Sequence, residues 1–427
     1  MPIDTCALAR RLGISGLYLF ALSGFVNQGG VYAGLGLMLL GILLTPRRAW
    51  NTLRGEPLAW LALVLTAYIL MRGAATLEAW PDVRPAKILR DTWNLAAVGG
   101  LFSLLTAWWL AGDTRRIARV LQLAVLSLLI GVLMGIDWQH FSVVMRLRQL
   151  FGMGNGAGVY SLVAITGLLV LRTSPVFEGA WLEGRLAPWI GKSTLALLLV
   201  LFIAVFLLSQ TRAAWLAALM VLPAALVLLA RARAGRWRER PLTGLGLILL
   251  AVLVVGATLG TGVVEKRLGV EQGSIALLFD GRLRDLPADS VGLRVRLWQD
   301  ALQRIGERPL FGWGAGSAPL MIRELGLRDS LTHYHDLYLQ LAVELGLVGV
   351  ALFAAWTLGV VHSARRAWRE QRIDLEYLVF VCACVAIFLI VFCFQIRHDD
   401  EKGQYLLILI GALALTQRLC RKRDSGA

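Results

Sequence analysis

The sequence predicts an all-α protein that crosses a membrane many times. Of its 427 residues, 57% are hydrophobic and only 17% are charged, and its mean hydropathy is +0.67. A soluble chain of this length would carry more charge, because it has to cover its core with a polar surface. The apolar residues gather in long runs, and basic residues gather in the segments between these runs. Together these observations favour a polytopic membrane protein.

The apolar runs indicate about twelve transmembrane helices, several of them shorter than the roughly 20 residues that cross a bilayer comfortably. The first run follows Arg10 and Arg11, as in a signal peptide. No small-residue cleavage site follows it, so we expect it to be retained as a helix. The expected spans are 12–27, 29–44, 57–72, 91–111, 120–136, 150–171, 193–208, 213–230, 243–262, 336–361, 375–395 and 404–418.

The net charge of +15 is mainly a topology signal. The basic clusters fall in alternate connections and therefore on one side of the expected bundle. Cytoplasmic loops of membrane proteins are enriched in Lys and Arg, which predicts that both termini are cytoplasmic. Contact with membrane lipids that are anionic is a smaller consequence, and nucleic acid is excluded as a partner. The clusters are 45–54, 113–119, 231–240, 363–370 and 418–423.

One long connection, residues 263–335, falls on the opposite, external side. Within it, apolar residues recur at helical spacing and predict an amphipathic helix over 291–307 that lies on the membrane face. Pro309 and the glycines of 312–316 predict that this helix ends in a tight turn. The glycines could suggest a phosphate-binding loop, but no strand precedes them. We therefore expect one integral membrane domain, 1–427, whose external loop covers a site.

Ionisable side chains gather on this external side. His335 falls where the span 336–361 begins, with His333 and Asp336 beside it. Arg212 occupies a short turn between two spans, where a charged group near the membrane needs an anionic partner. Arg294 presents a second guanidinium from the loop helix. Interfacial anchoring is the structural alternative for each of them, but the combination predicts a phosphate-bearing ligand and a proton transfer.

Three segments resemble the bacterial O-antigen ligase and polymerase superfamily: SQTRAAWLA, LRVRLWQDALQRIGERPLFGWGAGS and HDLYLQLAVELGLVG. The ligase signature of that superfamily is a His, a small polar residue and two later glycines, here His335, Asp336, Gly346 and Gly349. Asp336 stands where the superfamily usually has Asn, Ser or Gln. The resemblance is specific from about 205 to 350 and only topological elsewhere. It implies a GT-C-like fold with about a dozen spans and a large, partly helical periplasmic loop.

The resemblance implies an inner-membrane glycosyltransferase. It would transfer O-antigen polysaccharide from undecaprenyl diphosphate to a sugar hydroxyl of lipid A-core at the periplasmic face, with inversion. His335 would be the general base, and Arg212 and Arg294 would stabilise the departing diphosphate. Because the arginines can supply this charge, we expect no metal and no other cofactor, although a carboxylate-bound metal is a competing possibility. His333, two residues away, would point elsewhere if the segment were helical.

Weaker candidates for substrate binding are His333 and Asp336 beside the proposed base, and residues in other external segments. Arg84, Lys87 and Arg90 follow helical spacing and could present a basic face to core phosphates, although headgroup anchoring explains them equally well. The resemblance also suggests Asp399, or the aspartate after it, with a solvated turn as the alternative. Asn155, near the start of the sixth expected span, matches a superfamily segment loosely.

Three other functions compete with the ligase. A polymerase of the same superfamily often carries an Arg followed by a Gly eleven positions later, and no external Arg here has that spacing. A protein glycosyltransferase is disfavoured because the chain has no substantial soluble C-terminal extension. A lipid or polysaccharide transporter would place ionisable residues within its spans, and the expected spans contain almost none.

Overall fold

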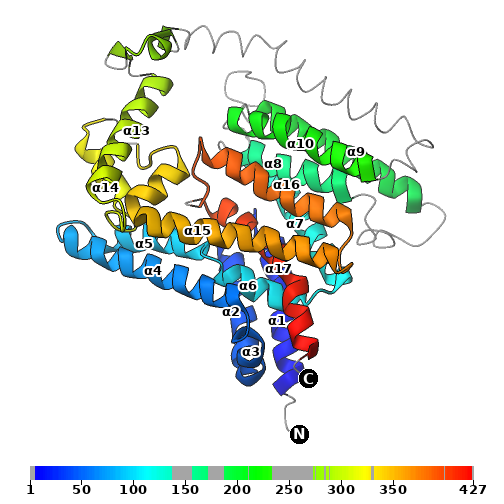
Figure 1. The fold of residues 1–427 in the computed structure, drawn as a ribbon. Helices are drawn as coiled ribbons and strands as arrows, with labels where there is room; N and C mark the ends of the chain where they lie inside the picture. The colour runs from blue at the N-terminus through cyan, green and yellow to red at the C-terminus, as the bar shows by residue number, and fades with distance from the viewer. Residues whose placement is uncertain are drawn as a thin grey trace.

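A computed structural model describes the chain at 5–136, 156–171, 187–209, 211–232, 273–274, 276–282, 285–287, 289–327, 331–398 and 400–425. These residues form helices and no strand (Figure 1). The helices are α1 (Thr5–Ser23), α2 (Gln28–Leu43), α3 (Pro46–Leu53), α4 (Pro57–Ala79), α5 (Pro85–Ala97), α6 (Leu101–Leu110), α7 (Thr114–Gly135), α8 (Gly156–Val170), α9 (Ala187–Leu208), α10 (Arg212–Ala232), α13 (Ser290–Glu307), α14 (Ala318–Glu324), α15 (Leu337–Arg369), α16 (Leu375–Phe392) and α17 (Glu401–Ser425).

The prediction of an all-α chain with several membrane spans is confirmed. In the described part of the chain, 7 helices are long and apolar enough to cross a membrane, or up to 9 if two bent pairs each form one span. The bent pairs are α2 with α3 and α5 with α6. The expected span 243–262 lies outside the described residues, and every other expected span overlaps a described helix. The count of about twelve spans is therefore not confirmed.

The described basic clusters meet at one end of the bundle. Arg418 forms an ion pair with Glu56 and donates to the Ser363 hydroxyl over 3.4 Å. The Gly112 N–H donates to the Thr416 hydroxyl over 2.7 Å. These contacts join the segments after α3, before α7, at the end of α15 and at the end of α17. The beginning of α1 lies near the end of α17 at the same end of the bundle (Figure 1).

Helix α15 is broken at Gly346, which has φ 66° and ψ −173°. A break deprives backbone groups of their helical partners, and the segment 309–314 supplies replacements on both sides. We call this arrangement the α15 clamp. Its N–H to O=C bonds are Trp313 to Val343 and Gly314 to Glu344, both 2.8 Å, then Leu347 to Pro309, 2.8 Å, and Val348 to Leu310, 3.2 Å.

One face of α4 holds the clamp from the other side. The Tyr68 hydroxyl donates to the Leu345 carbonyl over 2.6 Å. One and two helical turns later, the Arg72 guanidinium and the Thr76 hydroxyl donate to the carbonyls of residues 312 and 315 over 3.0 and 2.9 Å. Residues four apart share a helix face, so this stripe of donors can reach carbonyls both of α15 and of the segment packed against it.

The glycines of 312–316 are explained by this close packing. Gly312, Gly314 and Gly316 have φ values of 66°, 117° and 80°, a region that glycine adopts without steric cost. A Cβ on Gly314 would lie 2.1 Å from the hydroxyl oxygen of Thr76. The motif therefore joins the loop to α4 and α15, and its glycine content needs no bound phosphate.

Gly314→Ala should lower the free energy of unfolding by about 2 kcal/mol, because left-handed backbone at a non-glycine residue costs about 1–3 kcal/mol and the new Cβ would overlap Thr76. The matched control is Gly306→Ala on the exposed face of α13, where a Cβ would meet nothing within 4 Å. The control should be neutral or stabilising by up to about 1 kcal/mol. Thermal unfolding in detergent measures both, and equal unfolding temperatures would contradict the clamp.

Candidate functional site

The described part of the long connection packs as a cap, residues 289–327, against the first turns of α15 (Figure 1). The amphipathic helix predicted over 291–307 is confirmed as α13, and the carboxylate of Asp289 caps it by accepting from the N–H groups of residues 291 and 292. Helix α14 follows the clamp and was not predicted. The buried side chains that the cap shares with the start of α15 are Leu297, Ala301, Ala318, Met321, Ile322, Tyr334 and Val343.

The segment 331–336, which carries the two histidines, is anchored to α13 through Tyr334. Its side chain is fully buried, and its hydroxyl donates to the Asp300 carboxylate over 2.8 Å. The Trp298 indole N–H donates to the Tyr334 carbonyl over 3.1 Å. Burial and the Asp300 charge raise the pKa of the Tyr334 phenol, so it remains a donor. The backbone between the histidines is thus fixed by the cap.

His333 and His335 face each other, with ring centroids 4.3 Å apart and planes tilted by 59°. The prediction that His333 points away from His335 is wrong. It assumed a helix, whereas α15 begins only at Leu337, and His335 has a φ of 57° that turns the chain. Both rings are half-buried. The two rings therefore lie against each other as a pair.

Asp336 caps the N-terminus of α15. Its carboxylate accepts from the Leu339 N–H over 2.9 Å, and burial raises the pKa of the carboxyl despite the backbone N–H groups that favour its charged form. Asp, Asn and Ser are all effective N-cap residues. Asp336 differs from the residues usual in the signature, but it can cap the helix as Asn or Ser would.

Arg294 is half-buried on α13, one helical turn before Trp298. Because residues four apart share a helix face and Trp298 contacts Tyr334, Arg294 lies on the face of α13 that meets the histidine segment. Arg294 and the histidine pair therefore lie on neighbouring elements, α13 and the segment before α15.

Arg212 is the first residue of α10, and its side chain is exposed. Helix α10 packs along α16, and the end of α16 meets the start of α15, where the Tyr338 hydroxyl donates to the Leu389 carbonyl over 2.8 Å. The residues just before α10 also pack against the first turn of α8, because a Cβ on Gly158 would lie 2.3 Å from the Ser209 hydroxyl. Arg212 is thus at the histidine end of the bundle, one helix away from α15.

The segment between α16 and α17 closes this end. Asp400 accepts from the Tyr160 hydroxyl of α8 and pairs with Arg397 over 3.2 Å, so it links two spans rather than forming a solvated turn. His398 is buried. Asp399 and Asn155 lie outside the described residues. Among the residues that the structure describes, no group of three His, Cys, Asp or Glu side chains could hold a metal ion.

Of the predicted basic face, Lys87 and Arg90 lie in α5, which begins at Pro85, and Arg84 is its N-cap residue. The two arginines are exposed and Lys87 is half-buried. The other face of α5 meets the clamp, where the Thr92 hydroxyl donates to the carbonyl of residue 315 over 3.4 Å. These cations therefore project outward beside the clamp, and their contact with substrate remains a prediction.

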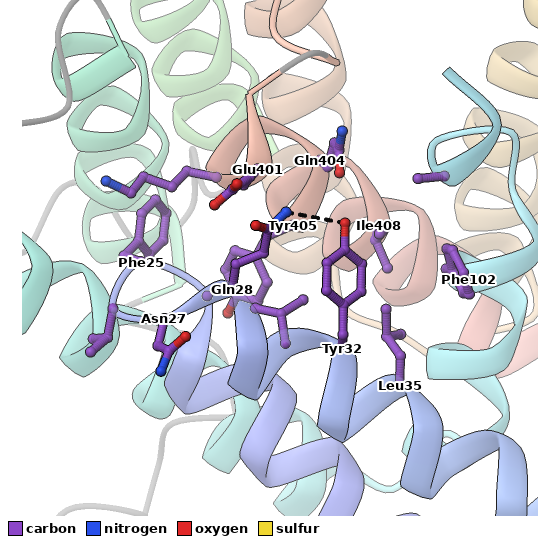
Figure 2. Close-up of a pocket in the computed structure, with 15 residues that line it drawn as sticks. Phe25, Asn27, Gln28, Tyr32, Leu35, Phe102, Glu401, Gln404, Tyr405 and Ile408 are labelled. Atoms are coloured by element: carbon purple, nitrogen blue, oxygen red, sulfur yellow. Dashed lines mark hydrogen bonds between the residues drawn. The ribbon is translucent and has the colours of Figure 1, made fainter. Parts of the chain in front are cut away.

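A pocket of about 200 Å³, which the sequence does not predict, opens between α2, α6 and the start of α17 (Figure 2). Gln28 donates to the Tyr32 hydroxyl one turn later on α2 over 3.1 Å, and Glu401 also lines the pocket. Gln404 lines it and donates to the His398 carbonyl over 2.6 Å. The lining comes from opposite ends of the chain and mixes polar residues with apolar ones such as Phe25, Leu35 and Phe102, so no local motif signals it.

Asp336→Asn should preserve stability and function, because an amide oxygen can accept from Leu339 as the carboxylate does. Asp336→Ala removes the cap and should cost about 1 kcal/mol. The raised pKa gives a second signature: the wild-type carboxyl binds its proton more tightly in the folded state, so it contributes stability at low pH and loses it as pH rises through that pKa. Asp336→Asn lacks this dependence.

Thermal unfolding of the three proteins from about pH 4, the ordinary carboxyl range, to neutrality measures both effects. The advantage of Asp336→Asn over the wild type should grow as pH rises. If Asp336→Asn were inactive although folded, the carboxylate would have a chemical role beyond capping.

The match with known proteins falls on the segments described above. Residues 197–354 match the family model for O-antigen ligase. The matched region begins in α9 and ends in α15, and it contains Arg212, Arg294, the histidine pair and the α15 clamp. A search of curated proteins found no match to the chain. The match over residues 197–354 supports membership of the O-antigen ligase superfamily.

Proposed function

We propose that this protein is an O-antigen ligase, which transfers a polysaccharide from undecaprenyl diphosphate to a sugar hydroxyl of lipid A-core. One observation carries the proposal: the region that matches the O-antigen ligase family also contains the histidine pair, with Arg294 on the facing side of α13 and Arg212 at the same end of the bundle. Both substrates would be amphiphiles, so the reaction requires a site where helices end at the membrane boundary.

In the proposed reaction, His335 takes the proton of the acceptor hydroxyl as its oxygen bonds to the anomeric carbon of the donor. The bond from that carbon to the diphosphate oxygen breaks, and its electron pair leaves with the diphosphate. Arg212 and Arg294 stabilise the charge that develops there, because guanidinium groups bind phosphate oxygens bidentately. His333, in contact with the His335 ring, orients it. Attack opposite the leaving group inverts the anomeric centre.

The proposal includes a location. The basic clusters at the far end of the bundle favour a cytoplasmic position for that end and for both termini, which leaves the histidine end in the periplasm of an inner-membrane protein. The cap within 263–335 would then cover the site. We further propose that Arg84, Lys87 and Arg90 meet the phosphates of the core, and that Asn155 and Asp399 contribute to substrate binding. No metal or other cofactor is required in this scheme.

Lipopolysaccharide from a deletion strain tests the function directly. We expect gels to lose all long-chain material attached to core while lipid-linked polymer accumulates. Cores that carry single repeats would instead indicate a polymerase, which shares the superfamily, and unchanged attachment to core would contradict both enzymes.

The same strain, complemented with point variants, tests the histidines. His335→Ala should abolish attachment at normal protein abundance, because a half-buried ring contributes little to packing. His333→Ala should retain some activity, since its proposed role is to orient the base. A His335→Ala protein that restored attachment would remove the general base from the mechanism.

Arg212→Lys should lower the rate of transfer by about 10²-fold or more, because Lys keeps the charge but loses the bidentate fork. Its matched control is Arg231→Lys at the other end of the same helix, which should be neutral.

Transfer by the purified wild-type protein should also survive exhaustive EDTA treatment. Loss of activity with EDTA and its return with magnesium or manganese would assign the charge stabilisation to a metal.

A further inference from the structure

A second site lies at the opposite end of the bundle from the histidine pair. A pocket of about 850 Å³ is formed by the first turns of α1, the α2–α3 junction, the end of α6 and the start of α7. Nothing in the proposed transfer reaction uses it. Its lining combines basic side chains with Ala9, Ile14 and the tryptophans at 108 and 109.

The pocket carries an excess of positive charge. Arg10, Arg11, Arg48 and Arg116 line it, and no Asp or Glu does. Arg116 pairs with Asp113 over 3.3 Å, outside the lining. Within the part of the chain that the structure describes, no ion pair engages the other three arginines. Like charges gathered in one pocket repel one another, so a bound anion would be stabilising.

Neighbouring elements place the pocket at the membrane surface. Helix α3 is bent by 94° from the apolar α2, so it runs across the end of the bundle while α2 runs into it. The exposed Trp50 and Trp60 pack edge to face beside this bend, and the Trp109 indole donates to the Met38 carbonyl over 2.9 Å. Tryptophan is enriched at the boundary between lipid and water, which is the depth of phospholipid headgroups.

We propose that this pocket binds the headgroup of an anionic phospholipid. The guanidinium groups would hold the phosphate oxygens, for which their fork geometry is suited. The apolar part of the lining, Ala9, Ile14 and Trp108, would contact the glycerol and the first methylenes of the acyl chains. A soluble phosphate would satisfy only the arginines. Basic pockets between helices at the cytoplasmic surface are a general form of anionic lipid recognition.

The test compares two double variants that remove the same charge. Arg10→Gln with Arg48→Gln alters the pocket. Arg47→Gln with Arg115→Gln alters exposed arginines at the same end that do not line it. Phosphatidylglycerol, added to protein purified in a neutral detergent, should raise the unfolding temperature of the wild type and of the Arg47/Arg115 variant. It should bind the Arg10/Arg48 variant at least fivefold more weakly, as measured by native mass spectrometry.

Phosphatidylethanolamine and inorganic phosphate serve as ligand controls, and both should bind at least fivefold more weakly than phosphatidylglycerol. Equal losses in the two double variants would mean diffuse attraction to a basic surface and would overturn the site. Inorganic phosphate that bound as tightly as the lipid would overturn the lipid assignment. If the Arg10/Arg48 variant does not fold, Arg48→Lys replaces it, and undiminished lipid binding by that variant would contradict the proposal.

Discussion

The break of α15 at Gly346 is the constraint on which the rest of the histidine end depends. A continuous helix would satisfy its own backbone groups and leave the loop before it without a fixed position. The break leaves carbonyl and N–H groups on both sides without helical partners, and the segment 309–314 forms hydrogen bonds with them. Helix α4 donates to this segment through Arg72, to residue 315 just after it through Thr76, and to the Leu345 carbonyl of α15 through Tyr68. The cap is therefore joined to the bundle. The cap in turn positions the histidine pair through Trp298 and Asp300.

The two glycines of the signature, Gly346 and Gly349, have different structural roles. Gly346 supplies the left-handed backbone at the break, where a Cβ would lie 2.3 Å from the Leu310 carbonyl oxygen. Gly349 is packed within the helix beyond the break, where a Cβ would lie 2.2 Å from the Cβ of Leu345. Asp336 starts the same helix. The signature thus describes how α15 begins and bends, and only its histidine is proposed to perform chemistry.

The fold class and the α13 helix could be predicted from the sequence because both depend on the local spacing of apolar residues. The α15 break could not, since the apolar run is the same whether the helix continues through Gly346 or bends there. The hydrogen bonds that decide between these outcomes come from residues 309–314 and α4, far apart in the chain. The contact between His333 and His335 could not be predicted either. It depends on a non-helical turn that α13 holds in place.

In the candidate site, too, some features could be predicted from the sequence and others could not. Arg212, Arg294 and His335 were identified from residue type and from their side of the expected topology, and the structure places them at one end of the bundle. The pocket at Gln28, Tyr32 and Glu401 could not be predicted, since its lining comes from the two ends of the chain. The described basic clusters meet at the other end, as the alternation of connections predicts. The molecule therefore has two chemically different ends.

The orientation of these two ends in the membrane is the claim on which the proposed chemistry depends most directly. It can be measured in a background in which the 5 native cysteines are replaced. Leu325→Cys on the cap and Arg115→Cys in a basic cluster then provide one exposed thiol at each end. In intact cells, we expect an impermeant thiol reagent to label Leu325→Cys and to spare Arg115→Cys until the inner membrane is permeabilised. Labelling in the reverse order would place His335 in the cytoplasm and contradict the account.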